Sequence, residues 1–258
     1  LTWMIGAGFE WEIPGYTVTL YANDGTDAWM PADRALINTE YPQPDCPFGH
    51  NYKIFKGWSF TPDGDIITFP ITLTEDAELY VIWEDTYSTV SFVANGGEGS
   101  MESVIAANGS IFTLPENGFT APAHERFASW AFADGTPAQD FTVTGDVTLM
   151  PVWEDILYTI YFVANGGEGS MESVIAISGS TFTLPENGFT APANKQFAGW
   201  AFADGTPAQD FTITGDVTLM PIWEDITYTI SFDANGGEGS MESVIAISGS
   251  TFTLPENG

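Results

Sequence analysis

Thr159-Ile-Tyr-Phe-Val-Ala164 and Glu172-Ser-Val-Ile-Ala-Ile177 are two runs of β-branched and aromatic residues joined by Asn165-Gly-Gly-Glu-Gly-Ser-Met171. Such residues favour strands because they pack well on a pleated surface. Asn-Gly between them favours a type I′ turn, since both residues tolerate positive φ. The stretch therefore predicts a β-hairpin. A second hairpin is predicted through Ser178-Gly-Ser180 into the strand 181–184.

The residues that follow predict further short strands. Segment 184–192 contains two prolines and a glycine, which exclude a long helix. A strand is expected at 197–202, followed by a turn at Asp204-Gly205, and another strand at 217–223. In that last strand the alternation predicts that Val217, Leu219 and Trp223 face the core. Pro221 lacks a ladder donor, so it is expected on an edge strand or at a bulge.

The same sequence pattern recurs along the chain. Phe92, Phe162 and Phe232 each begin a near-copy, and residues 92–155 match residues 162–225 at 55 of 64 positions. Regular spacing of this kind is the signature of a repeat architecture. Tryptophans recur at two positions of the repeat, which favours core packing over an exposed sugar-binding platform. The expected divisions are the end of a preceding repeat (1–15), a divergent repeat (16–85), two near-identical repeats (86–155 and 156–225) and an incomplete repeat (226–258).

Composition indicates a folded protein with an acidic surface. The 258 residues carry a formal net charge of −30, yet 44% are hydrophobic and 14% aromatic, which disordered acidic chains lack. With only five Lys and Arg, the chain cannot replace the counterions of nucleic acid or bind anionic lipid. No apolar run is long enough for membrane insertion as a helix, and the single cysteine excludes an internal disulfide.

Four motifs carry a resemblance to a known family. Tyr228-Thr-Ile-Ser-Phe-Asp-Ala-Asn-Gly-Gly237 is one, and Gly-Ser-Thr-Phe-Thr-Leu-Pro, Phe-Ala-Gly-Trp and Thr-Gly-Asp-Val-Thr-Leu-x-x-x-Trp occur in order within a repeat. Residues 16–258 thus resemble the Listeria–Bacteroides repeat, the B-repeat of internalin-type surface proteins. The resemblance implies tandem β-grasp-like (ubiquitin-like) modules of about 70 residues with little or no helix. It also implies an extracellular, cell-surface or cell-wall protein acting as a stalk, spacer or adhesin, with no catalytic residues.

Departures from the pattern provide the candidate interface residues. The divergent repeat contains an insertion at 41–50, and Trp29 lies outside the periodic tryptophans. The last strand of each near-identical repeat carries apolar residues where at least one polar residue is expected. The interface candidates are Met150, Val152, Met220, Ile222, Trp3 and Trp29.

Candidate chemistry is weak throughout the sequence. Recurring aspartates offer hard oxygen ligands for calcium, but without EF-hand spacing, so plain surface charge is the preferred interpretation. Cys46 and His50 are four residues apart, a spacing that permits a nucleophile pair but is better explained by a surface loop. We expect no enzyme activity, no catalytic residues and no cofactor. The calcium candidates are Asp134, Asp140, Asp146, Asp204, Asp210 and Asp216.

The leading functional hypothesis is a non-enzymatic structural array: a stalk, an adhesin or a filament component. Incomplete terminal repeats would allow head-to-tail self-assembly by strand addition, and truncation of a longer protein is the alternative explanation of those ends. Expected partners are further copies of the chain or other surface proteins. The competing hypothesis is a ligand-binding module whose divergent repeat recognises a glycan or a host protein.

Overall fold

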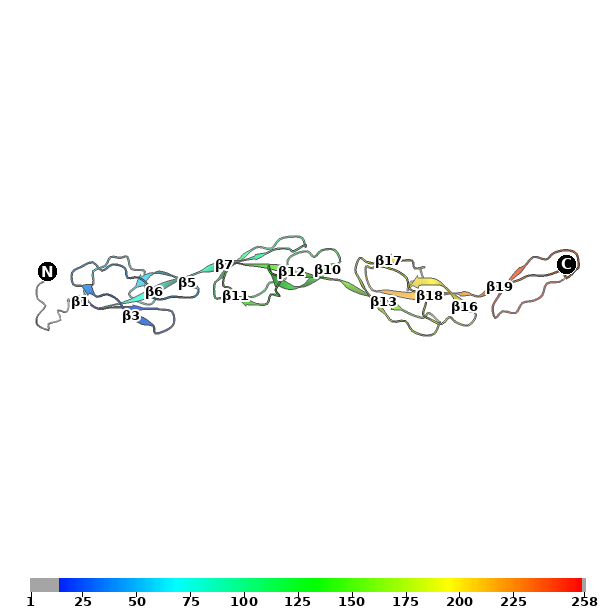
Figure 1. The fold of residues 1–258 in the computed structure, drawn as a ribbon, viewed down its shortest axis with the longest axis horizontal. Coiled ribbons are helices and arrows are strands. Elements are labelled where there is room, and N and C mark those ends of the chain that lie inside the picture. Colours follow the sequence, from blue (N-terminus) through cyan, green and yellow to red (C-terminus); the bar gives the residue numbers. More distant parts are fainter. Residues whose placement is uncertain (1–13, 257–258) are drawn as a thin grey trace. The chain divides into compact units, whose positions relative to one another are not determined.

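A computed structural model describes residues 14–256, so Trp3 and most of the predicted repeat end at 1–15 lie outside the described residues. The described part contains strands and turns and no helix (Figure 1), which confirms the mainly β prediction. It divides into two compact units. The first holds residues 14–95, 99–119 and 129–151, and the second holds 96–98, 120–128 and 152–256.

Repeat 156–225 shows the architecture most clearly. Its main sheet has the order β14-β13-β18-β16. The first and last strands, β13 and β18, run parallel at the centre, and each outer strand is antiparallel to its neighbour. A second, two-stranded sheet is formed by β15 and β17. The strands are β13 (Leu157–Phe162), β14 (Val174–Ile177), β15 (Thr181–Phe182), β16 (Lys195–Phe202), β17 (Phe211–Thr212) and β18 (Val217–Asp225).

The preceding repeats have the same strand order. The divergent repeat forms β3-β2-β6-β5. The next repeat, given from the same edge, forms β8-β7-β12-β10. The divergent repeat contains β1 (Gly15–Tyr16), β2 (Val18–Tyr21), β3 (Trp29–Pro31), β4 (Ala35–Leu36), β5 (Lys53–Ser59) and β6 (Ala77–Asp85). The next contains β7 (Tyr87–Phe92), β8 (Val104–Ala107), β9 (Ile111–Phe112), β10 (Glu125–Phe132), β11 (Phe141–Thr142) and β12 (Val147–Asp155). After residue 226, β19 (Thr227–Ile230) and β20 (Val244–Ile247) form the same first hairpin.

The predicted first hairpin is confirmed. Asn165 and Gly166 have φ of 49° and 90°, and the Gly167 N–H donates to the Ala164 carbonyl at 3.0 Å, as in a type I′ turn. Strand pairing begins further on, at Ile160 opposite Val174. The residues between turn and strand form a wide loop, in which Glu168 pairs with Thr190.

The predicted second hairpin is wrong. The chain does turn at Gly179, whose φ is 79°. However, the Gly179 N–H donates to the Ile213 carbonyl, and the Ile213 N–H donates to the Ser180 carbonyl, both at 2.8 Å. These bonds direct β15 onto β17, where the rings of Phe182 and Phe211 lie 5.6 Å apart. Long-range pairing through the core therefore replaces the local hairpin, and β15 does not cover β14.

Pro221 lies in a central strand, so the prediction of an edge strand is wrong. Its carbonyl accepts a hydrogen bond from the Asn165 side-chain amide at 3.0 Å, so this side of residue 221 faces the end of β13. The N and O of one strand residue point to the same side. Because β13 ends at Phe162, the missing donor leaves no ladder acceptor unpaired. A bulge does occur nearby, but in β16, between Phe197 and Gly199.

The core of repeat 156–225 lies between the main sheet and the loops that cross it. Leu219 is fully buried, as predicted, whereas Val217 and Trp223 are half-buried against the core. Trp200 is buried and its indole N–H donates to the Pro185 carbonyl at 2.8 Å. The prediction of core packing is thus confirmed for this series of tryptophans. The buried cluster is Ile160, Phe189, Trp200, Ile213 and Leu219.

Candidate functional surfaces

A hydrogen-bonded joint connects successive repeats within the second unit. At Ile226 the N–H donates to the Asn194 carbonyl at 3.0 Å, and the carbonyl accepts from the Ser248 N–H at 2.7 Å. The Ser248 hydroxyl also donates to the Asn194 side-chain carbonyl at 3.0 Å. The connecting residue is therefore held on both sides by backbone bonds.

The same joint recurs with different side chains. Ile156 bonds in the same way to His124 and Ser178, at 2.9 and 2.8 Å, and the His124 Nδ1 lies 3.0 Å from the Ser178 Oγ. In the first unit Thr86 bonds to Tyr52 and Asn108. Since only the side chains differ, the backbone pattern is the shared feature of the joint.

The six aspartates considered as calcium candidates make separate hydrogen bonds. Asp204 accepts from the N–H and hydroxyl of Thr206, Asp210 from the Leu184 N–H, and Asp216 from the Thr159 N–H. The copies Asp134, Asp140 and Asp146 bond in the same way to Thr136, Leu114 and Thr89. Within residues 14–256 no three metal-ligating side chains gather around one point. The structure thus assigns these aspartates to closing turns and loops.

The turn at Asp204 makes a testable acid–base prediction. The hydrogen bond from the Thr206 side chain, followed by that from its N–H, lowers the pKa of the exposed Asp204 carboxyl. Because the pKa is lower in the folded state, the ionised carboxylate stabilises the turn at pH values above the ordinary pKa of aspartate. This contribution disappears as the pH falls through the lowered pKa. Carbon NMR titration should therefore place the Asp204 midpoint below that of an ordinary aspartate. Thr206→Val should raise it, and an unchanged midpoint in that variant would contradict this cause.

Cys46 and His50 make separate contacts. The Cys46 thiol donates to the Phe48 carbonyl at 3.5 Å, and burial raises the pKa of this thiol. His50 accepts from the Tyr52 N–H at 3.3 Å, and its ring lies 5.4 Å from that of Trp83. A raised pKa disfavours the thiolate that a nucleophile requires. These contacts favour the interpretation as a structural loop.

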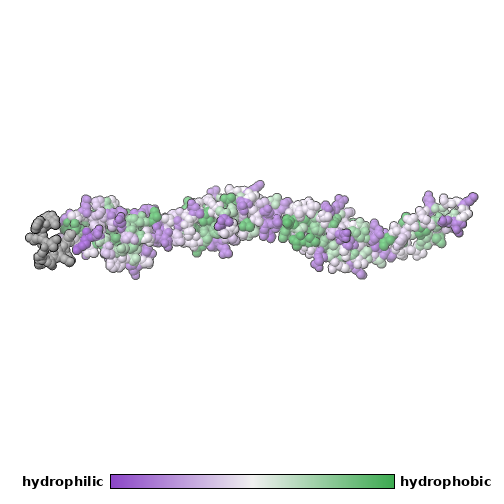
Figure 2. Space-filling view, viewed as in Figure 1, coloured by the Kyte–Doolittle hydropathy of each residue, from purple (hydrophilic) through white to green (hydrophobic). Residues whose placement is uncertain are grey.

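The interface candidates differ in exposure. Trp29 is 60% exposed on β3, and Val152 is also exposed, whereas Met150, Met220 and Ile222 are half-buried. Other exposed apolar residues were not among the interface candidates, namely Ile105, Ile175 and Ile245 on β8, β14 and β20. Figure 2 shows apolar residues interspersed with hydrophilic ones on the face in view.

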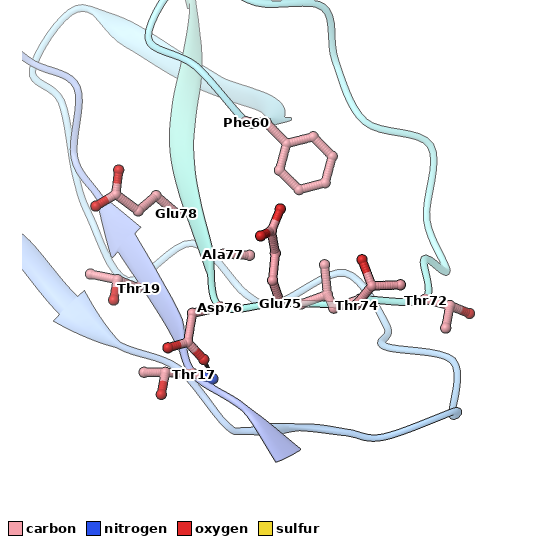
Figure 3. A pocket seen from close by; sticks show the side chains of 10 residues that line it. Thr17, Thr19, Phe60, Thr72, Thr74, Glu75, Asp76, Ala77 and Glu78 are labelled. Atoms are coloured by element: carbon pink, nitrogen blue, oxygen red, sulfur yellow. Dashed lines mark hydrogen bonds between the residues drawn. The ribbon is translucent and has the colours of Figure 1, made fainter.

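The divergent repeat has two surface hollows. One, of about 780 Å³, has Glu75, Asp76 and Phe60 among its lining residues, with the Glu75 side chain directed toward the Phe60 ring (Figure 3). Asp76 already accepts from the Thr17 N–H at 2.7 Å. The other hollow, of about 700 Å³, is lined by Met30 and by residues 41–45 of the predicted insertion, among others. The second hollow joins the insertion to the strand that carries Trp29.

Comparison with known proteins identifies the repeats. Residues 158–220 and 228–258 match the model of the Listeria-Bacteroides repeat domain, which confirms the resemblance for these residues. Two proteins of Evansella cellulosilytica are similar to the chain. "Putative Gly-rich membrane protein" is 35% identical over 252 residues, covering 90% of this chain and 27% of that protein. "Putative membrane protein" is 34% identical over 281 residues, covering 96% and 39%. The chain thus spans less than two fifths of either relative. None of its described elements is a helix that could cross a membrane.

Proposed function

Because residues 158–220 and 228–258 are Listeria–Bacteroides repeats, we propose that the protein is a non-enzymatic, load-bearing array of β-grasp-like repeats displayed at a cell surface. The names of both relatives place those proteins at a membrane, which supports display at the cell surface. An acidic charge of seven to nine per repeat keeps such a protein soluble. The strand order, with the first and last strands parallel at the centre, supports the β-grasp-like assignment.

The parallel central pair is the observation that carries the proposal. β13 begins the repeat and β18 ends it, and they pair with Ile160 opposite Val217 and Phe162 opposite Leu219. Tension along the chain pulls the start of β13 and the end of β18 in opposite directions. In a parallel pair this force loads the ladder bonds together in shear, whereas an antiparallel hairpin opens one bond at a time. This topology resists tension.

Stretching single molecules of the chain tests the proposal. Each complete repeat should unfold as one event that lengthens the chain by about 20–25 nm, since some 70 residues extend by at most 3.3–3.6 Å each. The unfolding force should be markedly higher when the chain is pulled through its ends than when repeat 156–225 is pulled through residues 177 and 157, which peels β14 from β13.

Pulling through residues 157 and 177 is the matched control because it applies force to the same repeat. Equal forces in the two geometries would contradict a load-bearing role. Unfolding far below the force at which isolated antiparallel hairpins open would contradict it as well. Protease treatment of intact cells that removes the chain would support its display at the surface.

A second candidate function rests on the divergent repeat. The exposed Trp29 and the hollow beside the insertion favour recognition of a glycan or a host protein by residues 16–85. Binding on a glycan array or to host-cell extracts should then disappear when residues 16–85 are deleted and be weakened by Trp29→Ala. Retained binding after the deletion would exclude this candidate.

A further inference from the structure

The two edges of the main sheet differ in repeat 156–225. On the β16 side, the chain returns along the edge: the Ala208 N–H donates to the Trp200 carbonyl at 2.8 Å, and the Phe202 N–H donates to the Thr206 carbonyl at 2.9 Å. A bulge between Phe197 and Gly199 further distorts this strand. Returning chain and bulges both prevent an edge from pairing with another strand. The β16 edge is therefore closed.

The opposite edge, β14, is open. The Ser178 N–H donates to the Ile156 carbonyl, so residue 178 faces β13. Hydrogen bonding alternates along an antiparallel strand, so Ala176 and Val174 also face β13. The N–H groups of Ile175 and Ile177 therefore point away from the sheet. The corresponding outward residues are Ile105 and Ala107 on β8, and Ile245 and Ile247 on β20.

The side chains beside these outward groups are apolar and exposed. Ile105, Ile175 and Ile245 are 73%, 60% and 62% exposed. Leu157 is also exposed and lies opposite Ile177 on the same face of the hairpin. The Ile177 carbonyl already accepts from the Ser180 N–H, so the outward N–H groups are the donors that this edge offers. An exposed apolar edge with free outward donors is a template for strand addition.

The divergent repeat carries a proline on the same outer strand. On β3 the Ala32 N–H donates to the Val18 carbonyl, so alternation places Pro31 at an outward position. Proline has no N–H, so β3 lacks an outward donor at this position. Pro31 lies opposite Thr19, whereas Ile175 lies opposite Thr159, the counterpart of Thr17, so this outer strand accepts proline two residues from the position of Ile175.

The charge near the open edges indicates which kind of partner strand could bind there. Glu172 is exposed two residues before β14, and the sequence contains no Lys or Arg between Arg126 and Lys195. The equivalent residues are Glu102 before β8 and Glu242 before β20. A second copy of this chain carries the same charge of −30 and would be repelled. We propose that β8, β14 and β20 each bind an extended, cationic segment of a partner protein, with apolar and basic side chains in alternation, as an added strand.

A fluorescent nine-residue peptide of alternating Lys and Val is the probe, titrated into the full chain. We expect three peptides bound per chain, and an affinity that falls about tenfold between 50 and 500 mM NaCl as the charges are screened. Hydrogen exchange at Ile175 and Ile245 should slow on binding. The same peptide with its five central amides methylated should bind about tenfold more weakly or not at all, because it cannot donate ladder bonds.

The triple variant I105P/I175P/I245P removes one of the two outward donors on each edge and should lose most of this binding. Pro31 shows that proline occurs at an outward position of the corresponding strand in the divergent repeat, and circular dichroism checks the fold. I105V/I175V/I245V is the matched control, since it keeps every N–H and should bind like the parent chain. The methylated peptide keeps the test valid if the proline variant fails to fold.

Four results would overturn the proposal. They are the absence of binding by the cationic peptide, equal binding of its methylated form, equal binding of a Glu–Val peptide, and unchanged binding by a folded proline variant. Sedimentation that shows dimers of the parent chain, abolished by the proline substitutions, would instead assign these edges to a second copy.

Discussion

Replacing Trp200 by alanine should lower the free energy of unfolding of repeat 156–225 by about 3–5 kcal/mol. Trp200 is 4% exposed, with the rings of Phe162 and Phe197 centred 5.5 Å from its own. Its indole N–H donates to the Pro185 carbonyl. The substitution therefore removes the largest side chain of the core cluster and leaves a partly buried carbonyl without its donor.

The effect is large relative to the stability of one repeat. A domain of some 70 residues has a total stability of about 4–10 kcal/mol. Urea denaturation of the full chain, followed by circular dichroism, should show a separate early transition in the variant. Trp29→Ala is the control, since Trp29 is exposed and its loss should change stability by about 0.5 kcal/mol or less. A loss below 1 kcal/mol for Trp200→Ala would show that this core repacks freely.

Replacing Gly167 by alanine should destabilise the same repeat by about 1–3 kcal/mol through overpacking. A Cβ at residue 167 would lie 2.5 Å from the Thr190 carbonyl oxygen and 2.7 Å from the Trp223 ring. The Thr190 carbonyl already accepts the Glu168 N–H at 2.9 Å, so the backbone cannot move away without breaking that bond. Denaturation of the full chain measures the loss.

Gly237→Ala is a matched control for Gly167→Ala. Gly237 occupies the same place in the same Asn-Gly-Gly sequence, yet a Cβ there would meet only the Ala234 carbonyl oxygen, at 3.2 Å. We expect this variant to unfold close to the parent chain. Equal destabilisation by the two substitutions would show that the local turn, and not the contact with Thr190 and Trp223, requires glycine.

Local structure could be predicted well because it depends on short-range residue preferences. The Asn165-Gly166 turn, the strands near 197–202 and 217–223, and the buried Trp200 all follow from backbone conformation and periodicity. The partner of β15 could not be predicted in this way. Its pairing with β17 depends on contacts between residues some 30 positions apart, which compete with the local hairpin.

The candidate surface was harder to predict than the fold. Met220 and Ile222 drew attention because they are apolar where a polar residue was expected, but both are half-buried. Ile175 is more exposed and resembles an ordinary core residue of a strand. A usable signal did exist: β3 carries proline at an outward position, whereas both outward positions of β14 are isoleucine. Its meaning depends on knowing which strand lies at the edge of the sheet.

The sequence by itself determined the repeats, the β class, the turns that need positive φ and the even acidic charge, because each of these is a property of composition or of neighbouring residues. Only the tertiary structure decided that β13 and β18 pair in parallel, that Pro221 belongs in a central strand, and that β14 has an open edge while β16 has a closed one. These features arise from pairings between distant segments. Gly167 and Gly237 share one local sequence, and in this structure Thr190 and Trp223 pack against Gly167.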